Sequence, residues 1–459
     1  MPVRIFCFLL LLVSGFTSLR AVTSVTSNGV TWTLMESRQT GAFVNGDPWV
    51  IGPVTVTSIT NTLSSPDYTP RPGQSGSMVN PGTDAKQGYE SSLKNYVAAL
   101  NAALPNGRPL SVDNPLALPP GTTLVSTVSW LYNSSTDTEP GTPRFNPATN
   151  TPRPTLRSAA VLTVLSAVPP SDAFRPPYSG ADKSIKFRAS QLDYKKLPRL
   201  ALPAGVTPPA FDVLANAFAR SWIDHVNGWQ ADWTHPSLNM PNYGRDMGRL
   251  VGDATLRLFT DDDAPRANPD KNHLIIGLVQ YGIDSAGIAD NGGGWPADGG
   301  HGLGRKWPIL FAGALIKDAH MLDAGRWPTR FQENEQHFYV TRAEVNLTGG
   351  LDWKPDKRAT LVPYAEKDIG TPEWGIRHGT YPQSDNAHFT ATYRDINGAV
   401  NPAFALAARA MGLKQAWNHD AFFDYADRFM TWRLAEPAPA NQPSPFLVAM
   451  WNAHRPNLR

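Results

Sequence analysis

The chain has 459 residues, of which 41% are hydrophobic and 17% charged. It is therefore long enough to bury a large core and to form about two or three domains, and its composition excludes a disordered chain. Its 41 Lys and Arg residues nearly balance its 39 Asp and Glu residues. A net charge near zero provides no basic surface for nucleic acid, so we expect no nucleic-acid partner.

The first 21 residues have the pattern of a secretory signal peptide. Arg4 precedes the apolar run 5–13, and the segment ends in smaller, more polar residues up to Ala21. The alternative is an uncleaved N-terminal anchor, although the run is short for a bilayer span. No later segment is apolar for long enough to cross a membrane. We expect a secreted or periplasmic protein with no membrane span after signal cleavage.

Removal of this leader would also remove the only cysteine, Cys7. The mature chain would then have no disulfide, no thiol nucleophile and no zinc site built on cysteine. Because Arg4 and Arg20 leave with the leader, 39 basic residues would stand against 39 acidic ones. No two histidines have the spacing of a zinc-binding helix. We expect neither a metal site nor a cofactor.

Residues 22–168 have the pattern of short strands separated by turns. Valine and threonine alternate there, which suits a pleated surface buried on one side. The clearest strands are predicted at 30–34, 54–59, 124–130 and 160–165. Together they predict an antiparallel β-sandwich domain over 22–168, interrupted by a helical stretch at about 87–103. A proline-rich connector, 169–208, follows it and is predicted to lie along the surface.

Residues 209–459 have the pattern of a helical domain. Met247, Leu250 and Val251 begin an apolar set that follows one face of a helix. Helices are predicted at 243–260, 271–288, 307–322, 402–411 and 418–432. Helices of this length joined by glycine- and tryptophan-rich loops indicate an (α/α) toroid-like or solenoid domain with its loops at one end. The predicted fold class is thus multidomain α and β.

Histidine and tryptophan are concentrated in this helical half. All ten histidines and 11 of the 14 tryptophans lie after residue 208. Catalysis and ligand stacking are therefore expected there, with the β-domain as a support.

The richest loop is 290–307, which has seven glycines in its 18 residues. Glycines let the backbone turn tightly and approach a ligand closely. Candidate site residues stand between them, namely Trp295, Asp298, His301, Arg305 and Lys306. The loop leads into a predicted helix N-terminus, where anions are favoured. The alternative is a structural connector in which Trp295 and Trp307 fill the core and His301 caps a helix.

Three further segments hold candidate site residues. Segment 370–379 contains Glu373, Trp374, Arg377 and His378, segment 385–395 contains Asn386, His388, Tyr393 and Arg394, and segment 235–246 contains Asn239 and Tyr243. The alternative for each is a structural loop whose arginines pair with nearby carboxylates.

Loops of this composition indicate carbohydrate, because indole faces stack on sugar rings and charged side chains bond to hydroxyls and carboxylates. In architecture and kinds of residue, the segment from about 209 to 435 resembles the helical-toroid polysaccharide lyases and glycoside hydrolases that carry an additional β-domain. The resemblance implies a secreted enzyme that degrades a polysaccharide. A polysaccharide lyase acting on a uronic-acid-containing glycan is the leading hypothesis, and Arg305 and Lys306 favour an anionic substrate.

In a lyase of that kind, β-elimination needs a neutralised carboxylate, a base for the C5 proton and an acid for the leaving oxygen. His301 or His388 is the expected base, and Tyr393 the expected proton donor. Asn386, Arg377 and Arg305 are the expected carboxylate binders. Further substrate contacts are expected from Trp295, Lys306, Trp374, His378, Arg394, Asn239 and Tyr243.

Two alternatives remain open on the sequence. An inverting glycoside hydrolase would use Asp298 and Glu373 about 6.5 to 9.5 Å apart, one as acid and one as base. A non-catalytic glycan-binding surface protein would use the same aromatic side chains without a reaction.

Overall fold

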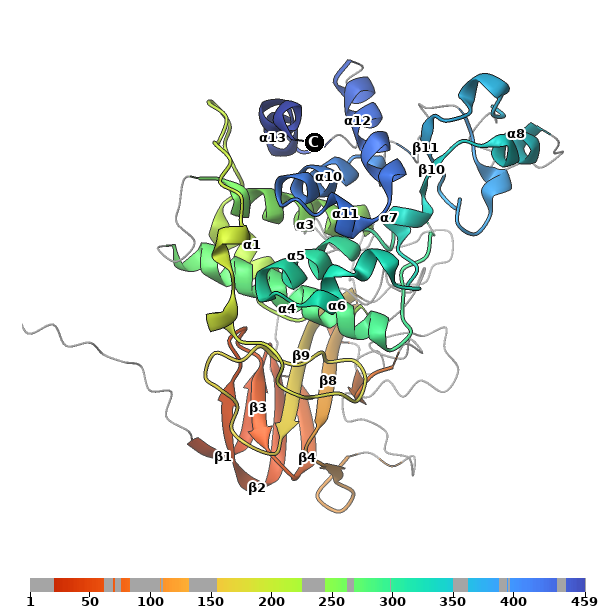
Figure 1. The fold of residues 1–459 in the computed structure, drawn as a ribbon. Helices are drawn as coiled ribbons and strands as arrows, with labels where there is room; N and C mark the ends of the chain where they lie inside the picture. Colours follow the sequence, from red (N-terminus) through yellow and green to blue (C-terminus); the bar gives the residue numbers. More distant parts are fainter. Residues whose placement is uncertain are drawn as a thin grey trace, which may run out of the picture.

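The computed structural model describes most of the chain from residue 20 onward. The described ranges are 20–61, 69–70, 76–82, 108, 110–131, 155–224, 244–261, 268–297, 299–349, 362–387, 394, 397–435 and 443–458. Within them the fold is mixed α and β, with a sheet in the N-terminal half and helices in the rest (Figure 1). Residues 1–19 of the predicted leader and the predicted helix at 87–103 lie outside these ranges.

The sheet is strongly curled and consists of strands linked by pairing into one unit. Its strands are β1 (Arg20–Ser27), β2 (Val30–Ala42), β3 (Pro48–Ile51), β4 (Val54–Asn61), β5 (Thr69–Pro70), β6 (Gly76–Val79), β7 (Leu116–Leu118), β8 (Thr122–Leu131) and β9 (Thr155–Leu165). The order is β5-β8-β9-β3-β2-β4-β7, with β1 on β2 and β6 on β8. The four predicted strands are confirmed as parts of β2, β4, β8 and β9.

Two features of the sheet bear on the sandwich prediction. Alternate residues at the start of β2, Val30, Trp32 and Leu34, are buried, as the alternation of apolar residues with threonine predicts. The pairing of β3 with β9, however, is parallel, whereas the other strand pairs described are antiparallel. The sheet is therefore mixed rather than wholly antiparallel.

The second half of the chain is mainly helical. Its helices are α1 (Phe211–Ala217), α3 (Gly244–Phe259), α4 (Pro269–Asp290), α5 (Lys306–Ile316), α6 (Ala319–Leu322), α7 (Gln332–Glu335), α8 (Arg342–Gly349), α10 (Asn401–Ala410), α11 (Lys414–Trp417), α12 (Asp420–Ala435) and α13 (Pro445–His454). The predicted helices are confirmed in α3, α4, α10 and α12. The prediction of one helix over 307–322 is wrong, because Lys317 adopts a left-handed conformation and Asp318 caps α6.

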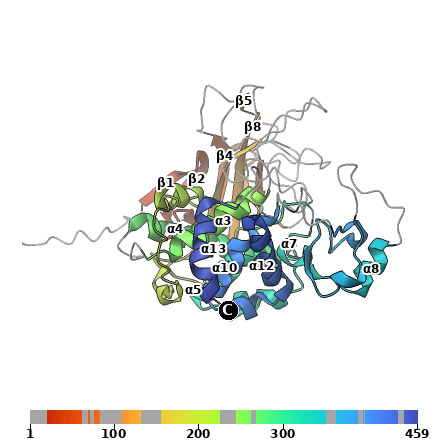
Figure 2. The ribbon, with the colours of Figure 1, turned by 90° about the horizontal axis from the view of Figure 1, so that it is seen from above.

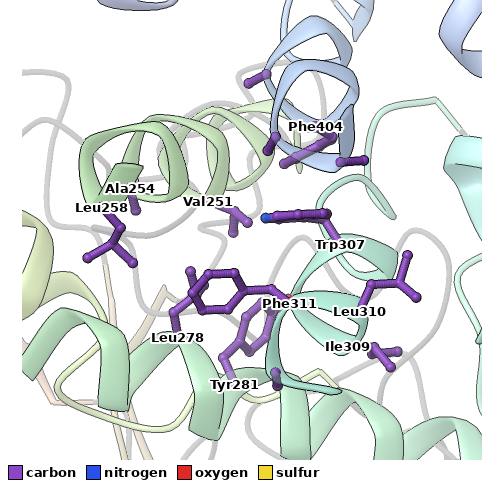
Figure 3. Close-up of a cluster of buried hydrophobic side chains, with 14 of the residues drawn as sticks. Val251, Ala254, Leu258, Leu278, Tyr281, Trp307, Ile309, Leu310, Phe311 and Phe404 are labelled. Carbon is purple, nitrogen blue, oxygen red and sulfur yellow. The ribbon is translucent and has the colours of Figure 1, made fainter. Parts of the chain in front are cut away.

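Helix α5 lies at the centre of the helical half and is buried along its whole length. Figure 3 shows Trp307 of α5 between Val251 of α3 and Phe404 of α10. The Trp307 indole donates to the Thr255 hydroxyl at 2.8 Å, so its one polar atom is satisfied in the core. Helix α4 passes between the sheet and the other helices (Figure 1).

Part of the predicted connector is buried between the two halves instead of lying on the surface. Its Arg175 donates from Nε to Asp47 of the β2–β3 turn at 2.6 Å. The same guanidinium makes a two-pronged pair with Asp284 of α4, at 2.5 and 3.0 Å. Burial alone would lower the pKa of Arg175, but the two carboxylates raise it. The connector enters the core because its charge has partners from both halves.

Candidate functional site

Two of the predicted loops meet at Gln336, the residue after α7. Its side-chain Nε2 donates to the carbonyl of Gly299 at 2.6 Å and to that of Ile376 at 3.1 Å. Its Oε1 accepts from the Trp374 indole at 3.1 Å. One amide thus joins the glycine-rich loop 290–307 to segment 370–379, although the two are far apart in the sequence.

Helix α7 also binds the glycine-rich loop, through the side chain of Glu333. The Glu333 carboxylate accepts from the backbone N–H groups of Gly304 at 2.8 Å and Arg305 at 3.1 Å, at the start of α5. Burial raises the pKa of Glu333, and these backbone hydrogen bonds oppose the rise. The anion expected at this helix N-terminus is therefore supplied by the protein's own side chain.

Segment 385–395 joins the same cluster through strand β11 (Pro372–Trp374), which pairs with β10 (His337–Tyr339). Glu373 on β11 accepts from Arg394 at 2.6 Å through Oε2, and from Arg428 of α12 through Oε1. Arg394 also donates to the carbonyl of Asn386 at 3.0 Å. These strands and α8 project to one side of the helices (Figures 1 and 2).

The most reactive arrangement in this cluster is a pair formed by His378 and Asp385. The His378 Nδ1 lies 2.7 Å from Oδ2 of the buried Asp385. An ionised carboxylate can only accept, so Nδ1 carries the proton and Nε2 keeps a lone pair. The His378 side chain is 20% exposed, and Nε2 has no hydrogen-bond partner among the described residues. This is the arrangement of a general base.

Packing fixes both members of the pair. The His378 ring is stacked on Phe338 of β10, with 3.6 Å between centroids and 3° between planes. Burial raises the pKa of Asp385, and the hydrogen bond with His378 opposes the rise. A Cβ atom at Gly375 would lie only 1.9 Å from the Asp385 carboxylate, so glycine is required for this close approach.

Several predicted substrate-binding residues are buried. Trp295 and Trp374 are 1% and 4% exposed, which leaves neither indole with a face for a sugar ring. Arg305 is buried and donates two hydrogen bonds to Asp224, at 2.9 and 3.0 Å. Lys306 donates to Asn334 at 2.9 Å, and burial lowers its pKa to about 7. Such placements match the structural alternative for these residues.

The remaining predicted residues fall into three groups. His301 is buried at 4% exposure in the glycine-rich loop. Arg377, next to His378, is exposed, and the Asn386 side chain accepts from the backbone of Val362 at 3.0 Å. Five predicted site residues lie outside the described residues, namely Asp298, His388, Tyr393, Asn239 and Tyr243.

Of the predicted hydrolase pair, Glu373 lies within the described residues and Asp298 lies outside them. Both carboxylate oxygens of Glu373 accept from buried or half-buried guanidinium groups, so neither faces a substrate. Its placement is that of a structural ion pair.

Asp385, Gln336 and Gly375 carry the geometry of the site but are not among the predicted site residues. Asp385 and His378 are brought together by the turn of residues 379–384, and their spacing matches no recurrent motif. The only available signal was the density of titratable residues in 373–386.

Comparisons of this chain with protein-family models, with curated proteins and with solved structures give no match. Across the described part of the chain, no helix combines the length and apolar character needed to cross a membrane. Over the same ranges, no three His, Cys, Asp or Glu side chains are grouped so that they could hold a metal ion.

Proposed function

We propose that the protein is a polysaccharide lyase that cleaves a uronic-acid-containing glycan by β-elimination, with His378 as the base. The observation that supports this proposal is the His378–Asp385 pair, in which a side chain that is 20% exposed binds the carboxylate through Nδ1 and keeps the lone pair on Nε2. His301 was the expected base, but its burial makes it the weaker candidate. His388, the other expected base, lies outside the described residues.

In this mechanism the Nε2 atom of His378 takes the C5 proton of the uronate. The electrons of the broken C5–H bond form a C4–C5 double bond, and the C4–O glycosidic bond breaks. Asp385 stabilises the resulting imidazolium, as a buried carboxylate does in other histidine pairs. The leaving oxygen takes a proton from a phenol, for which Tyr393 remains our proposal.

The substrate carboxylate also needs a cation, because a neutralised carboxylate makes the C5 proton more acidic. Arg377 is exposed and adjacent to His378, and a guanidinium can pair with a carboxylate through two hydrogen bonds. We therefore assign this task to Arg377, with Asn386 as a second contact. Arg305 is less suited to it, because its guanidinium already pairs with Asp224.

We propose in addition that the helical half is a partial (α/α) toroid, and that the curled sheet is a sandwich-like support. The leader pattern supports export and cleavage near Ala21. Mass analysis of the mature N-terminus would test that cleavage.

The test of function is incubation of the full chain with a panel of uronic-acid polymers, monitored by the ultraviolet absorbance of the unsaturated product. His378→Ala should lower kcat by about 10²- to 10⁴-fold, because it removes the base. His273→Ala, an exposed histidine of α4, is the matched control and should retain full activity. Reducing ends without the unsaturated product would indicate hydrolysis instead. Binding of the polymers without any product would indicate a binding module.

A further inference from the structure

A second site is built at the opposite end of α4 from the glycine-rich loop. A groove of about 460 Å³ lies between the former connector and the ends of α3 and α4. Its lining includes Lys195 and Arg199 from the connector and Lys271 from α4. No carboxylate belongs to the described lining residues, so the groove has a positive character.

The groove has one buried cation, Lys271, and two exposed ones, Lys195 and Arg199, and this set suits an anionic ligand. The Lys271 ammonium is buried, donates to the carbonyl of Thr260 at 3.0 Å and lies 5.3 Å from the centre of the Phe211 ring. Arg199 is exposed and donates through one of its nitrogens to a backbone carbonyl at 3.2 Å. Lys195 is exposed, and the nearby Asp193 carboxylate pairs with Lys317 at 3.3 Å instead.

The rest of the groove is apolar. Leu197, Pro198 and Leu258 line it, and Tyr194 contributes its ring while its hydroxyl donates to Asn272 at 2.9 Å. Aliphatic and aromatic surface suits the C–H faces of sugar rings, and the cations around it suit carboxylates. A groove of mixed character is therefore better matched to an acidic sugar chain than to a small inorganic ion.

We infer that this groove binds a second, uronate-bearing segment of the glycan, remote from the reaction. This inference rests on the proposed function for the identity of the ligand. Helix α4 has 22 residues and is about 33 Å long. Lys271 lies near the start of α4 and the glycine-rich loop follows its end, so the groove and the loop lie at opposite ends of the helix. Only a long glycan chain would contact both. A second contact raises the effective concentration of a polymer at the first.

The experiment uses the full chain carrying His378→Ala, so that turnover of the probe is strongly reduced. The probe is a six-residue oligomer of galacturonate, and its fully methyl-esterified form is the uncharged control. Lysine acetylation followed by mass spectrometry should show Lys195 protected by the charged oligomer. Lys196, which is adjacent and does not line the groove, is the internal control and should not be protected.

Calorimetry then tests the stoichiometry. The oligomer should bind at two sites per chain, and at one site when Lys195→Ala and Arg199→Ala are combined. Lys196→Ala should leave two sites. Unprotected Lys195, equal protection by the esterified oligomer, or equal protection by a six-nucleotide DNA strand would each overturn the inference. Protection of Lys195 in a protein that forms no unsaturated product would instead count against the proposed lyase function alone.

Discussion

Two buried aspartates, Asp284 and Asp385, each pair with a nitrogen-bearing side chain, but the two pairs have opposite characters. Asp284 and Asp47 surround Arg175 at the boundary between the sheet and the helices, and Arg175 is fully buried. Asp385 pairs with a His378 side chain that remains 20% exposed. The first pair is closed on itself, whereas the second leaves a ring nitrogen open.

Structural charges in this chain can be separated from reactive ones by whether every polar atom of the pair has a partner. A buried ion pair with every group satisfied holds elements together, and removing one partner leaves an unpaired charge. A pair that keeps one polar atom without a hydrogen-bond partner at the surface can still react with a substrate. By this criterion Arg305 and Glu373 belong with Arg175, and His378 stands apart from them.

Breaking the closed pair should have the greatest consequence. Arg175→Ala leaves Asp47 and Asp284 buried without their cation, and it should lower the free energy of unfolding by about 3–5 kcal/mol. Urea denaturation measures this change. Arg188→Ala is the control, because its pair with Asp172 is partly exposed to solvent and should contribute less than about 1 kcal/mol. Similar losses in the two variants would contradict the distinction.

The next effect is on the open pair. Asp385→Asn should lower kcat about 100-fold, or about 2.7 kcal/mol, because an amide can donate to Nδ1 and so favour the wrong tautomer of His378. Loss of the carboxylate also removes the charge that stabilises the imidazolium formed in the reaction. Steady-state kinetics measure the loss, and a merely structural Asp385 would change the free energy of unfolding and leave kcat in place.

His337 is buried and hydrogen-bonded, so we expect it to affect the stability of the fold and not the rate of the reaction. Burial lowers the pKa of His337 from 6.5 to about 3, and Nδ1 contacts the carbonyl of Glu333 at 2.6 Å. Between about pH 6.5 and 3, the His337 ring is protonated in the unfolded chain but not in the folded one. The stability present above about pH 6.5 is therefore lost as the pH falls toward 3. The slope is about 1.4 kcal/mol per pH unit. Denaturation at several pH values should show that His337→Gln lacks this slope, and an unchanged slope would refute the assignment.

A change in the backbone beside the open pair should have a more modest consequence. Gly375→Ala forces its new methyl group against the Asp385 carboxylate, and misplacement of the pair should lower kcat about tenfold. Gly349→Ala is the matched control, because a Cβ there meets no atom within 4 Å. Steady-state kinetics compare the two. Equal rates for both variants would mean that the position of Asp385 does not matter.

Periodicity allowed the regular elements to be predicted, because it reports which face of a strand or helix is buried. The apolar steps of α3 and the alternation at the start of β2 are examples. It failed at Lys317, where a left-handed residue ends α5 within an apolar pattern. It also failed for the connector, since the burial of Arg175 depends on carboxylates from two distant segments.

The candidate site was only partly predictable for the same reason. The grouping of segments 290–307, 370–379 and 385–395 was expected from their composition, and Gln336, Glu373 and Arg394 join them. Which residues stay accessible was not predictable. Tryptophan and arginine occur both at binding sites and in the packed core. Whether Trp295 and Arg305 bind a ligand or pack in the core depends on their tertiary neighbours.

The Glu333 carboxylate also affects which ligands this protein could acquire. It occupies the backbone donors at the start of α5, so an incoming sulfate or phosphate would be repelled from a place that usually attracts one. Removal of this side chain would leave the two buried N–H groups without their acceptor.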